Sequence, residues 1–160
     1  MASSFPKSLD TLFGTAELFS KYVSEGTGGK FSVRTFAAGE IVPPLQVLDA
    51  VQKNTIEMGQ SSGYYYIGKN PALAFDTAVP FGLNSRQTNA WMYEGDGMKL
   101  MRDVYKDYNI VNFPLGNTGT QMGGWYRKEI KTVEDIKGLK MRIAGLAGEI
   151  ITRLGGLPQQ

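Results

Sequence analysis

The chain of 160 residues contains no cysteine and no histidine. The lack of cysteine excludes disulfides and thiolate chemistry. The lack of histidine removes the usual general base, the usual zinc ligand and every Ser-His or Cys-His catalytic arrangement. No stretch approaches the roughly 18 consecutive apolar residues of a membrane-spanning helix. The polar residues 1–4 do not resemble a signal peptide.

A strong excess of either charge is also missing. Lysine and arginine total 17, aspartate and glutamate total 15, and the net charge is +2. This balance argues against nucleic acid or an acidic membrane surface as a partner. Apolar residues make up 42% of the chain, which is enough for a hydrophobic core. The composition indicates one ordinary domain or a piece of a larger protein.

Helical and strand periodicities alternate in the first third of the chain. The predicted elements are a strand end at Phe5-Pro6, helix 9–24, strand 31–36, helix 45–52 and strand 56–59. In the second helix, Leu45, Leu48 and Val51 are expected to face the core. Helices that alternate with strands predict the α/β class.

Three consecutive tyrosines occupy residues 64–66. Three phenols in a row cannot all face one core, so at least one is expected to be exposed or to line a cleft. They are either half-buried loop anchors or contacts to a ligand. After them, helices are predicted over 84–93 and 98–108, and a strand over 110–115.

A glycine-rich stretch, GNTGTQMGGW, runs from Gly116 to Trp125. Its neutral hydrogen-bonding side chains and terminal tryptophan have the composition of a small-ligand pocket. The alternative interpretation is an ordinary glycine-rich turn that leads into an edge strand. The stretch lacks the Gly-Lys-Ser/Thr of a phosphate loop, so nucleotide binding is not supported.

The region from Thr132 to Glu149 carries the clearest functional pattern. Thr132 starts a short helix that ends at Gly138, a strand follows over 139–143, and a second helix runs over 147–154 after a glycine turn. Anions commonly bind where a strand leads through such a turn into a helix N-terminus. Arg142, just before the turn, predicts a carboxylate site.

No strand is predicted after the last helix, at residues 157–160, although helical crossovers lead to parallel strands. We therefore expect a truncated chain. The predicted division is a first lobe over 1–124 and the start of a second lobe over 125–160.

Six motifs in chain order resemble the solute-binding proteins of tripartite ATP-independent periplasmic (TRAP) transporters, and most closely the subgroup that binds 2-oxo acids. The motifs are GEIVP at Gly39, LQVLDAVQ at Leu45, YYYIGK at Tyr64, PFGLN at Pro80, GNTGTQMGGW at Gly116 and EDIKGLKMRIAG at Glu134. The resemblance implies an α/β, periplasmic binding protein-like (type II-like) two-lobe fold, present here only in part.

The resemblance also implies roles for individual residues. Arg142 is expected to pair with the ligand carboxylate, and Gln121 to help coordinate a sodium ion that bridges to the ligand. One tyrosine of residues 64–66 is expected to reach the pocket, with Tyr65 as the first candidate and Tyr64 as the second. Motif position alone adds two further ligand contacts, Asn117 and Trp125.

The function implied is that of a periplasmic, non-enzymatic subunit without a cofactor. It delivers a small carboxylate such as pyruvate to membrane permease subunits, and the full-length form is expected to bind sodium and to form a homodimer. The 160-residue chain is expected to bind weakly or not at all, because half of the site is missing. The alternatives are a small α/β enzyme that acts on a carboxylate and an interaction module that binds no ligand.

Overall fold

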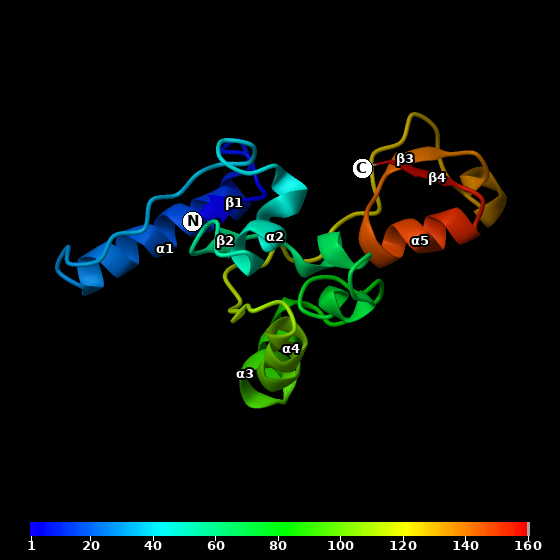
Figure 1. The fold of residues 1–160 in the computed structure, drawn as a ribbon. Helices are drawn as coiled ribbons and strands as arrows, with labels where there is room; N and C mark the ends of the chain where they lie inside the picture. The colour runs from blue at the N-terminus through cyan, green and yellow to red at the C-terminus, as the bar shows by residue number, and fades with distance from the viewer. Residues whose placement is uncertain (160) are drawn as a thin grey trace.

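The computed structural model describes residues 1–159 and shows a mixed α/β protein (Figure 1). The predicted α/β class is therefore confirmed. None of its helices in this range is both long and apolar enough to cross a membrane. The elements, with 3₁₀ helices marked η, are β1 (Ala2–Ser3), α1 (Asp10–Gly26), η1 (Pro44–Gln46), α2 (Val47–Gln52), β2 (Gly59–Gln60), η2 (Gly63–Tyr66), η3 (Pro71–Ala74), α3 (Ser85–Glu94), α4 (Gly97–Lys106), η4 (Val133–Ile136), β3 (Lys140–Arg142), α5 (Gly145–Arg153) and β4 (Leu157–Gln159).

The N-terminal sheet is small and parallel. Strand β1 pairs with β2 in the register Ala2↔Gly59, and a single bridge joins Ala2 to Phe36. The strand predicted over 31–36 is therefore wrong except at Phe36. The strand predicted over 110–115 is also wrong, since this extended segment pairs with no strand in the described residues. Both segments have strand-like side chains, but a strand also needs a partner backbone.

Buried side chains form two adjacent clusters. The larger brings η2, η3, α3 and α4 around Leu73, which is fully buried. The smaller packs Phe13 of α1 against Phe5 and Ala37, which lie outside the helix. The half-buried Tyr65 contacts both clusters and therefore stands at the junction between them.

The last elements, β3, α5 and β4, form a parallel βαβ unit. Lys140 pairs with Leu157 and Arg142 with Gln159, so the expectation that no strand follows the last helix is wrong. Pro158 concealed this strand, because proline reads as a strand breaker in sequence. It lies opposite Met141 in a two-stranded sheet, where every strand is an edge and the missing proline N–H is tolerated.

Most helices agree with their predicted spans, and the exception concerns Leu45. Pro43 and Pro44 precede a 3₁₀ turn, so α2 begins only at Val47. Leu45 consequently does not face the core as predicted and is 48% exposed. The short helix predicted from Thr132 is a 3₁₀ helix, η4, with the expected capping by Asp135.

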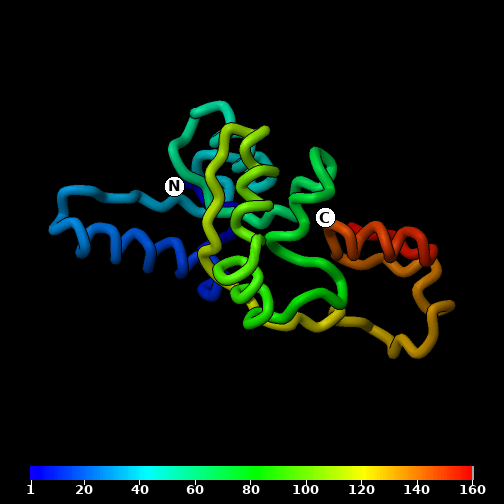
Figure 2. The backbone as a smooth tube through the Cα atoms, turned by 90° about the horizontal axis from the view of Figure 1, so that it is seen from below, coloured from blue at the N-terminus to red at the C-terminus, as the bar shows by residue number. Residues whose placement is uncertain are grey.

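The molecule is elongated. Figure 2 shows α1 projecting from one end and the βαβ unit from the other, with the helices α3 and α4 between them. Contacts between α5 and η2 join the βαβ unit to the rest. The lobe boundary at residue 124 stays a prediction.

Candidate functional site

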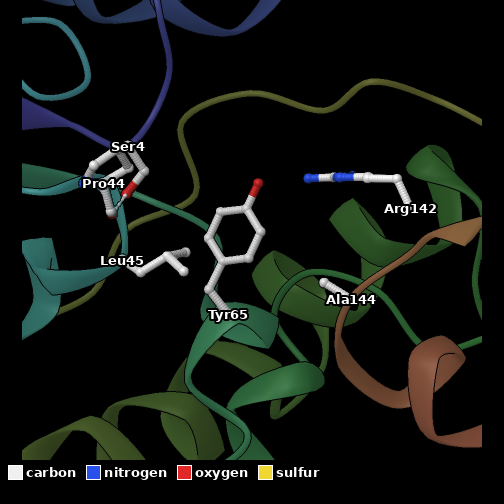
Figure 3. A pocket seen from close by; sticks show the side chains of 6 residues that line it. All are labelled: Ser4, Pro44, Leu45, Tyr65, Arg142 and Ala144. Atoms are coloured by element: carbon white, nitrogen blue, oxygen red, sulfur yellow. Dashed lines mark hydrogen bonds between the residues drawn. The ribbon is translucent and has the colours of Figure 1, made fainter. Parts of the chain in front are cut away.

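A pocket of about 230 Å³ lies between the N-terminal body, which comprises the elements from β1 to α4, and the βαβ unit. Ser4, Pro44 and Leu45 form one wall, Arg142 and Ala144 form the other, and Tyr65 rises between them (Figure 3). In this view the Tyr65 hydroxyl and the Arg142 guanidinium point toward each other across the open space. The pocket therefore offers one cation and one phenol to a small guest.

Arg142 is the last residue of β3, and its guanidinium lies near the Tyr64 hydroxyl, where it opposes the rise that burial causes in the pKa of Tyr64. Five ion pairs occur within residues 1–159, and none of them involves Arg142. Two residues later Ala144 caps α5 without any side-chain hydrogen bond. The first amides of α5 thus keep their partial positive charge close to the guanidinium. This combination suits a carboxylate.

The three tyrosines of η2 have separate environments, as the sequence predicts for at least one of them. Tyr66 is 4% exposed, and its hydroxyl accepts from the Leu48 amide at 3.2 Å. Tyr65 is half-buried, with its ring centroid 4.5 Å from that of Tyr64 and 6.4 Å from that of Phe5. Burial and the neighbouring Tyr65 raise the pKa of Tyr64 to about 12, while the Arg142 guanidinium acts in the opposite direction.

A polar network beneath η2 fixes its start. The Gly63 amide donates to Thr77 Oγ1 at 2.8 Å, and Thr77 donates to Asp76 Oδ1 at 2.6 Å. The Tyr105 hydroxyl donates to Asp76 Oδ2 at 2.6 Å. Burial raises the pKa of Asp76, although the hydrogen bonds from Thr77 and Tyr105 oppose this. A side chain at Gly63 would collide with Asp76 Oδ1 and the Leu73 carbonyl oxygen.

The wall opposite Arg142 is also tied down by hydroxyl groups. Ser4 Oγ donates to the Pro44 carbonyl at 2.6 Å and lies 2.7 Å from Ser61 Oγ. Ser61 Oγ in turn lies 2.9 Å from the Tyr66 hydroxyl. A chain of hydroxyls therefore links this wall to the same tyrosine helix that carries Tyr65.

The glycine-rich loop does not contribute to this pocket. Asn117 accepts from Ser85 Oγ and from the Gly119 amide, both at 2.8 Å. Gln121 Nε2 donates to Thr118 Oγ1 at 2.7 Å. Trp125 is 91% exposed. Of the predicted site residues, the pocket lining includes Arg142 and Tyr65; Tyr64 packs against Tyr65 without lining the pocket, and Asn117, Gln121 and Trp125 do not line it. Their predicted roles in ligand or sodium binding stay predictions.

Sequence reasoning missed four residues that line the pocket: Ser4, Pro44, Leu45 and Ala144. Ala144 lies two positions after Arg142, and residues at that spacing share one face of a strand, so it could have been found. The other three could not, because hydrogen bonds and packing across the fold bring them to the pocket.

The chain is similar to a known protein family and to individual proteins of known kind. Residues 2–160 match the family described as bacterial extracellular solute-binding protein, family 7 (DctP). A monocarboxylate 2-oxoacid-binding periplasmic protein of Nostoc sp. (strain PCC 7120) is 59% identical over 155 residues, which are 97% of this chain and 42% of that protein.

Two solved structures give the same result for the fold. A TRAP transporter solute binding protein from Bordetella bronchiseptica RB50, a mixed-occupancy dimer with calcium and picolinate, has a TM-score of 0.97 and 52% identity, over 100% of this chain and 48% of its own. One from Pseudoalteromonas atlantica T6c, with bound sodium and pyruvate, has a TM-score of 0.94 and 42% identity, over 99% and 48%. The chain spans about half the length of these relatives.

These matches confirm the resemblance and the solute-binding-protein fold predicted from the six motifs. The family description names the binding of an extracellular solute, so the prediction that the chain is not an enzyme is confirmed. The chain belongs to the bacterial extracellular solute-binding protein family 7.

Proposed function

We propose that the chain is the part of a periplasmic TRAP-transporter subunit that captures the carboxylate of a small 2-oxo acid such as pyruvate. The observation that carries this proposal is the Arg142 guanidinium, which faces Tyr65 over a small pocket and pairs with no carboxylate in residues 1–159. Two relatives whose names or structures include a 2-oxo acid support the choice of ligand.

The pocket can bind an acid in three ways. The planar guanidinium of Arg142 can donate two parallel hydrogen bonds to a carboxylate. The uncapped first turn of α5 adds amide donors and a favourable dipole. The Tyr65 hydroxyl can donate to the 2-oxo group or to the second carboxylate oxygen. At about 230 Å³ the pocket is smaller than drug-sized sites, which favours a compact ligand.

A cation site is only partly supported by these residues. Gln121 has a suitable amide oxygen, since its nitrogen is the atom that donates to Thr118. However, residues 1–159 contain no group of three or more acidic side chains that could hold a metal ion, and Gln121 does not line the pocket. We propose Gln121 as one ligand to sodium in the full-length protein, and carboxylate capture by Arg142 does not depend on it.

The partners follow from the same proposal. The full-length protein passes its ligand unaltered to membrane permease subunits, and it forms a homodimer, as the dimeric Bordetella relative suggests. The chain alone leaves Arg142 exposed to water. An exposed pair of this kind contributes only about 0–1 kcal/mol. We therefore expect the 160-residue chain to bind pyruvate weakly or not at all.

Calorimetric titration with pyruvate tests the proposal. A full-length protein that carries this sequence should bind pyruvate, and more tightly in sodium than in potassium buffer. The 160-residue chain should give no micromolar binding in either buffer. Micromolar binding by the short chain would refute the half-site argument, and no binding of any 2-oxo acid by the full-length protein would refute the function.

A further inference from the structure

The turn between β3 and α5 rests directly on the ring of Tyr64. Gly145 begins α5 with φ +64°. A Cβ at this position would lie 2.7 Å from Tyr64 Cδ2 and 3.4 Å from Tyr64 Cγ. The first of these distances is shorter than real Cβ contacts, so only glycine lets the backbone approach the ring this closely. The turn and the tyrosine are therefore in van der Waals contact.

Tyr64 is itself fixed in the N-terminal body. It belongs to η2, whose first residue is hydrogen-bonded to Thr77 and packed against the Asp76 carboxylate. The ring also packs against Tyr65, the pocket tyrosine, with a centroid distance of 4.5 Å and a tilt of 50°. The Tyr64 ring therefore lies between the core and the turn that begins α5.

Arg142 lies three residues before Gly145, on the strand that this turn ends. Any displacement of the turn from Tyr64 therefore moves the guanidinium relative to Tyr65. We propose that the contact between Tyr64 and Gly145 positions Arg142 over the pocket, and that Tyr64 acts as a positioning residue through its ring. This inference rests on the proposed function for its ligand, a 2-oxo acid, and on geometry alone for the contact.

Tyr64 Cδ2, Cγ and Cβ, and not the hydroxyl, are the nearest atoms to the Cβ position of Gly145. This gives a clear distinction between two roles for Tyr64. If Tyr64 acts through its ring, Tyr64→Phe keeps the spacing between η2 and α5 and Tyr64→Ala changes it. If Tyr64 acts only through its hydroxyl, neither variant changes that spacing.

Gly138, two residues before β3, supplies a matched control. It has φ +71°, close to that of Gly145, but no atom lies within 4 Å of its ideal Cβ position. An alanine at either glycine meets the same backbone strain. Only at Gly145 does it also push against Tyr64. The difference between Gly145→Ala and Gly138→Ala therefore isolates the contact.

The first measurement needs no ligand. The chain has no native cysteine, so Lys53→Cys with Arg153→Cys allows spin labels on the N-terminal body and on α5, both at exposed positions. The distance distribution by electron paramagnetic resonance should shift or broaden in Gly145→Ala and Tyr64→Ala. It should stay unchanged in Gly138→Ala and Tyr64→Phe. The double variant Gly145→Ala with Tyr64→Ala should resemble Tyr64→Ala alone, because without the ring the added methyl group no longer collides with it.

The second measurement is pyruvate affinity in the full-length protein. Gly145→Ala and Tyr64→Ala should each weaken binding on the order of tenfold, and Gly138→Ala should leave it unchanged. Equal distance distributions for Gly145→Ala and Gly138→Ala would overturn the inference. Tyr64→Ala tests the contact from the other side, so the question is decided even where alanine at 145 prevents folding. If the spin-label distances change in Gly145→Ala and Tyr64→Ala but the full-length protein does not bind pyruvate, the proposed function is refuted. The positioning role of Tyr64 is then retained.

Discussion

The tyrosine helix η2 and the glycine-rich loop 116–125 both have the composition of a binding site, yet they differ in how the rest of the fold supports them. Beneath η2, Gly63, Asp76 and Tyr105 form a hydrogen-bonded base in the core. In the loop, Gln121 donates to Thr118 of the same loop, Asn117 is bonded to Ser85 of α3 at the surface, and Trp125 is 91% exposed. The comparison teaches that a site needs a supporting base as well as suitable side chains.

Removing the base of η2 should give the largest effect on stability. Gly63→Ala introduces a Cβ that collides with a backbone carbonyl and with Asp76, so we expect a loss of about 3 kcal/mol in unfolding free energy. Gly68→Ala is the matched control, since nothing lies within 4 Å of its Cβ position. It should change stability by less than about 0.5 kcal/mol. Urea unfolding measures both, and equal midpoints would contradict the role of Gly63.

The next effect concerns binding rather than stability. Arg142→Ala in the full-length protein should weaken pyruvate binding by about 10- to 100-fold, because charge-assisted hydrogen bonds to the carboxylate are lost. Arg153→Ala is the control in the same βαβ unit, where the arginine pairs with Glu149 at 2.6 Å on the surface. Calorimetry should find its affinity unchanged. Unaltered affinity in Arg142→Ala would make the site assignment wrong.

Tyr105→Phe should destabilise the hydrogen-bonded base beneath η2 less than Gly63→Ala does. Asp76 then loses one hydrogen bond, and we expect a loss of about 1.5 kcal/mol at neutral pH. Because burial raises the folded-state pKa of Asp76 above its unfolded value, ionisation of Asp76 costs stability as pH rises through the folded pKa. The deficit of the variant should therefore shrink as the solution is acidified below that pKa.

The control for this change is Tyr93→Phe, whose ring is 61% exposed on α3. It should show neither the stability loss nor the pH dependence. Thermal unfolding between pH 4 and pH 8 compares the two variants, and a deficit that is constant with pH would argue against Asp76 as the group affected.

The smallest effect is expected in the loop. Trp125→Ala should change the stability of this chain by less than about 0.5 kcal/mol, because the side chain is 91% exposed. Trp91→Ala removes the other tryptophan, which packs against the larger core cluster, and should cost clearly more. A large loss in Trp125→Ala would show that the loop is better supported than its contacts indicate.

The sequence predicted best those features that depend on residues close together in the chain, such as helix caps. Asn84 and Gln87 cap α3 reciprocally, and the predicted start of that helix agrees with the structure. Asp135 caps η4 as expected. The strand predicted over 139–143 agrees with β3, but those over 31–36 and 110–115 failed, because pairing depends on residues far apart in the sequence, as between Ala2 and Gly59. Pro158 hid β4 because its tolerance depends on strand position.

The same division applies to the site. Arg142 was recognisable because strand, turn and helix follow each other within a few residues. The tyrosines were recognisable because three phenols cannot share one core. The composition of residues 116–125 was just as suggestive, but glycine and amide side chains permit a pocket without fixing where the loop runs.

The parallel pairing of β3 with β4 has a kinetic consequence. It closes a loop on the order of twenty residues, whereas the contact between Ser4 and Ser61 joins residues separated by 57 positions. Short-range contacts form faster than long-range ones. During refolding, the segment that carries Arg142 should therefore be assembled early, and the serine wall opposite it should close last.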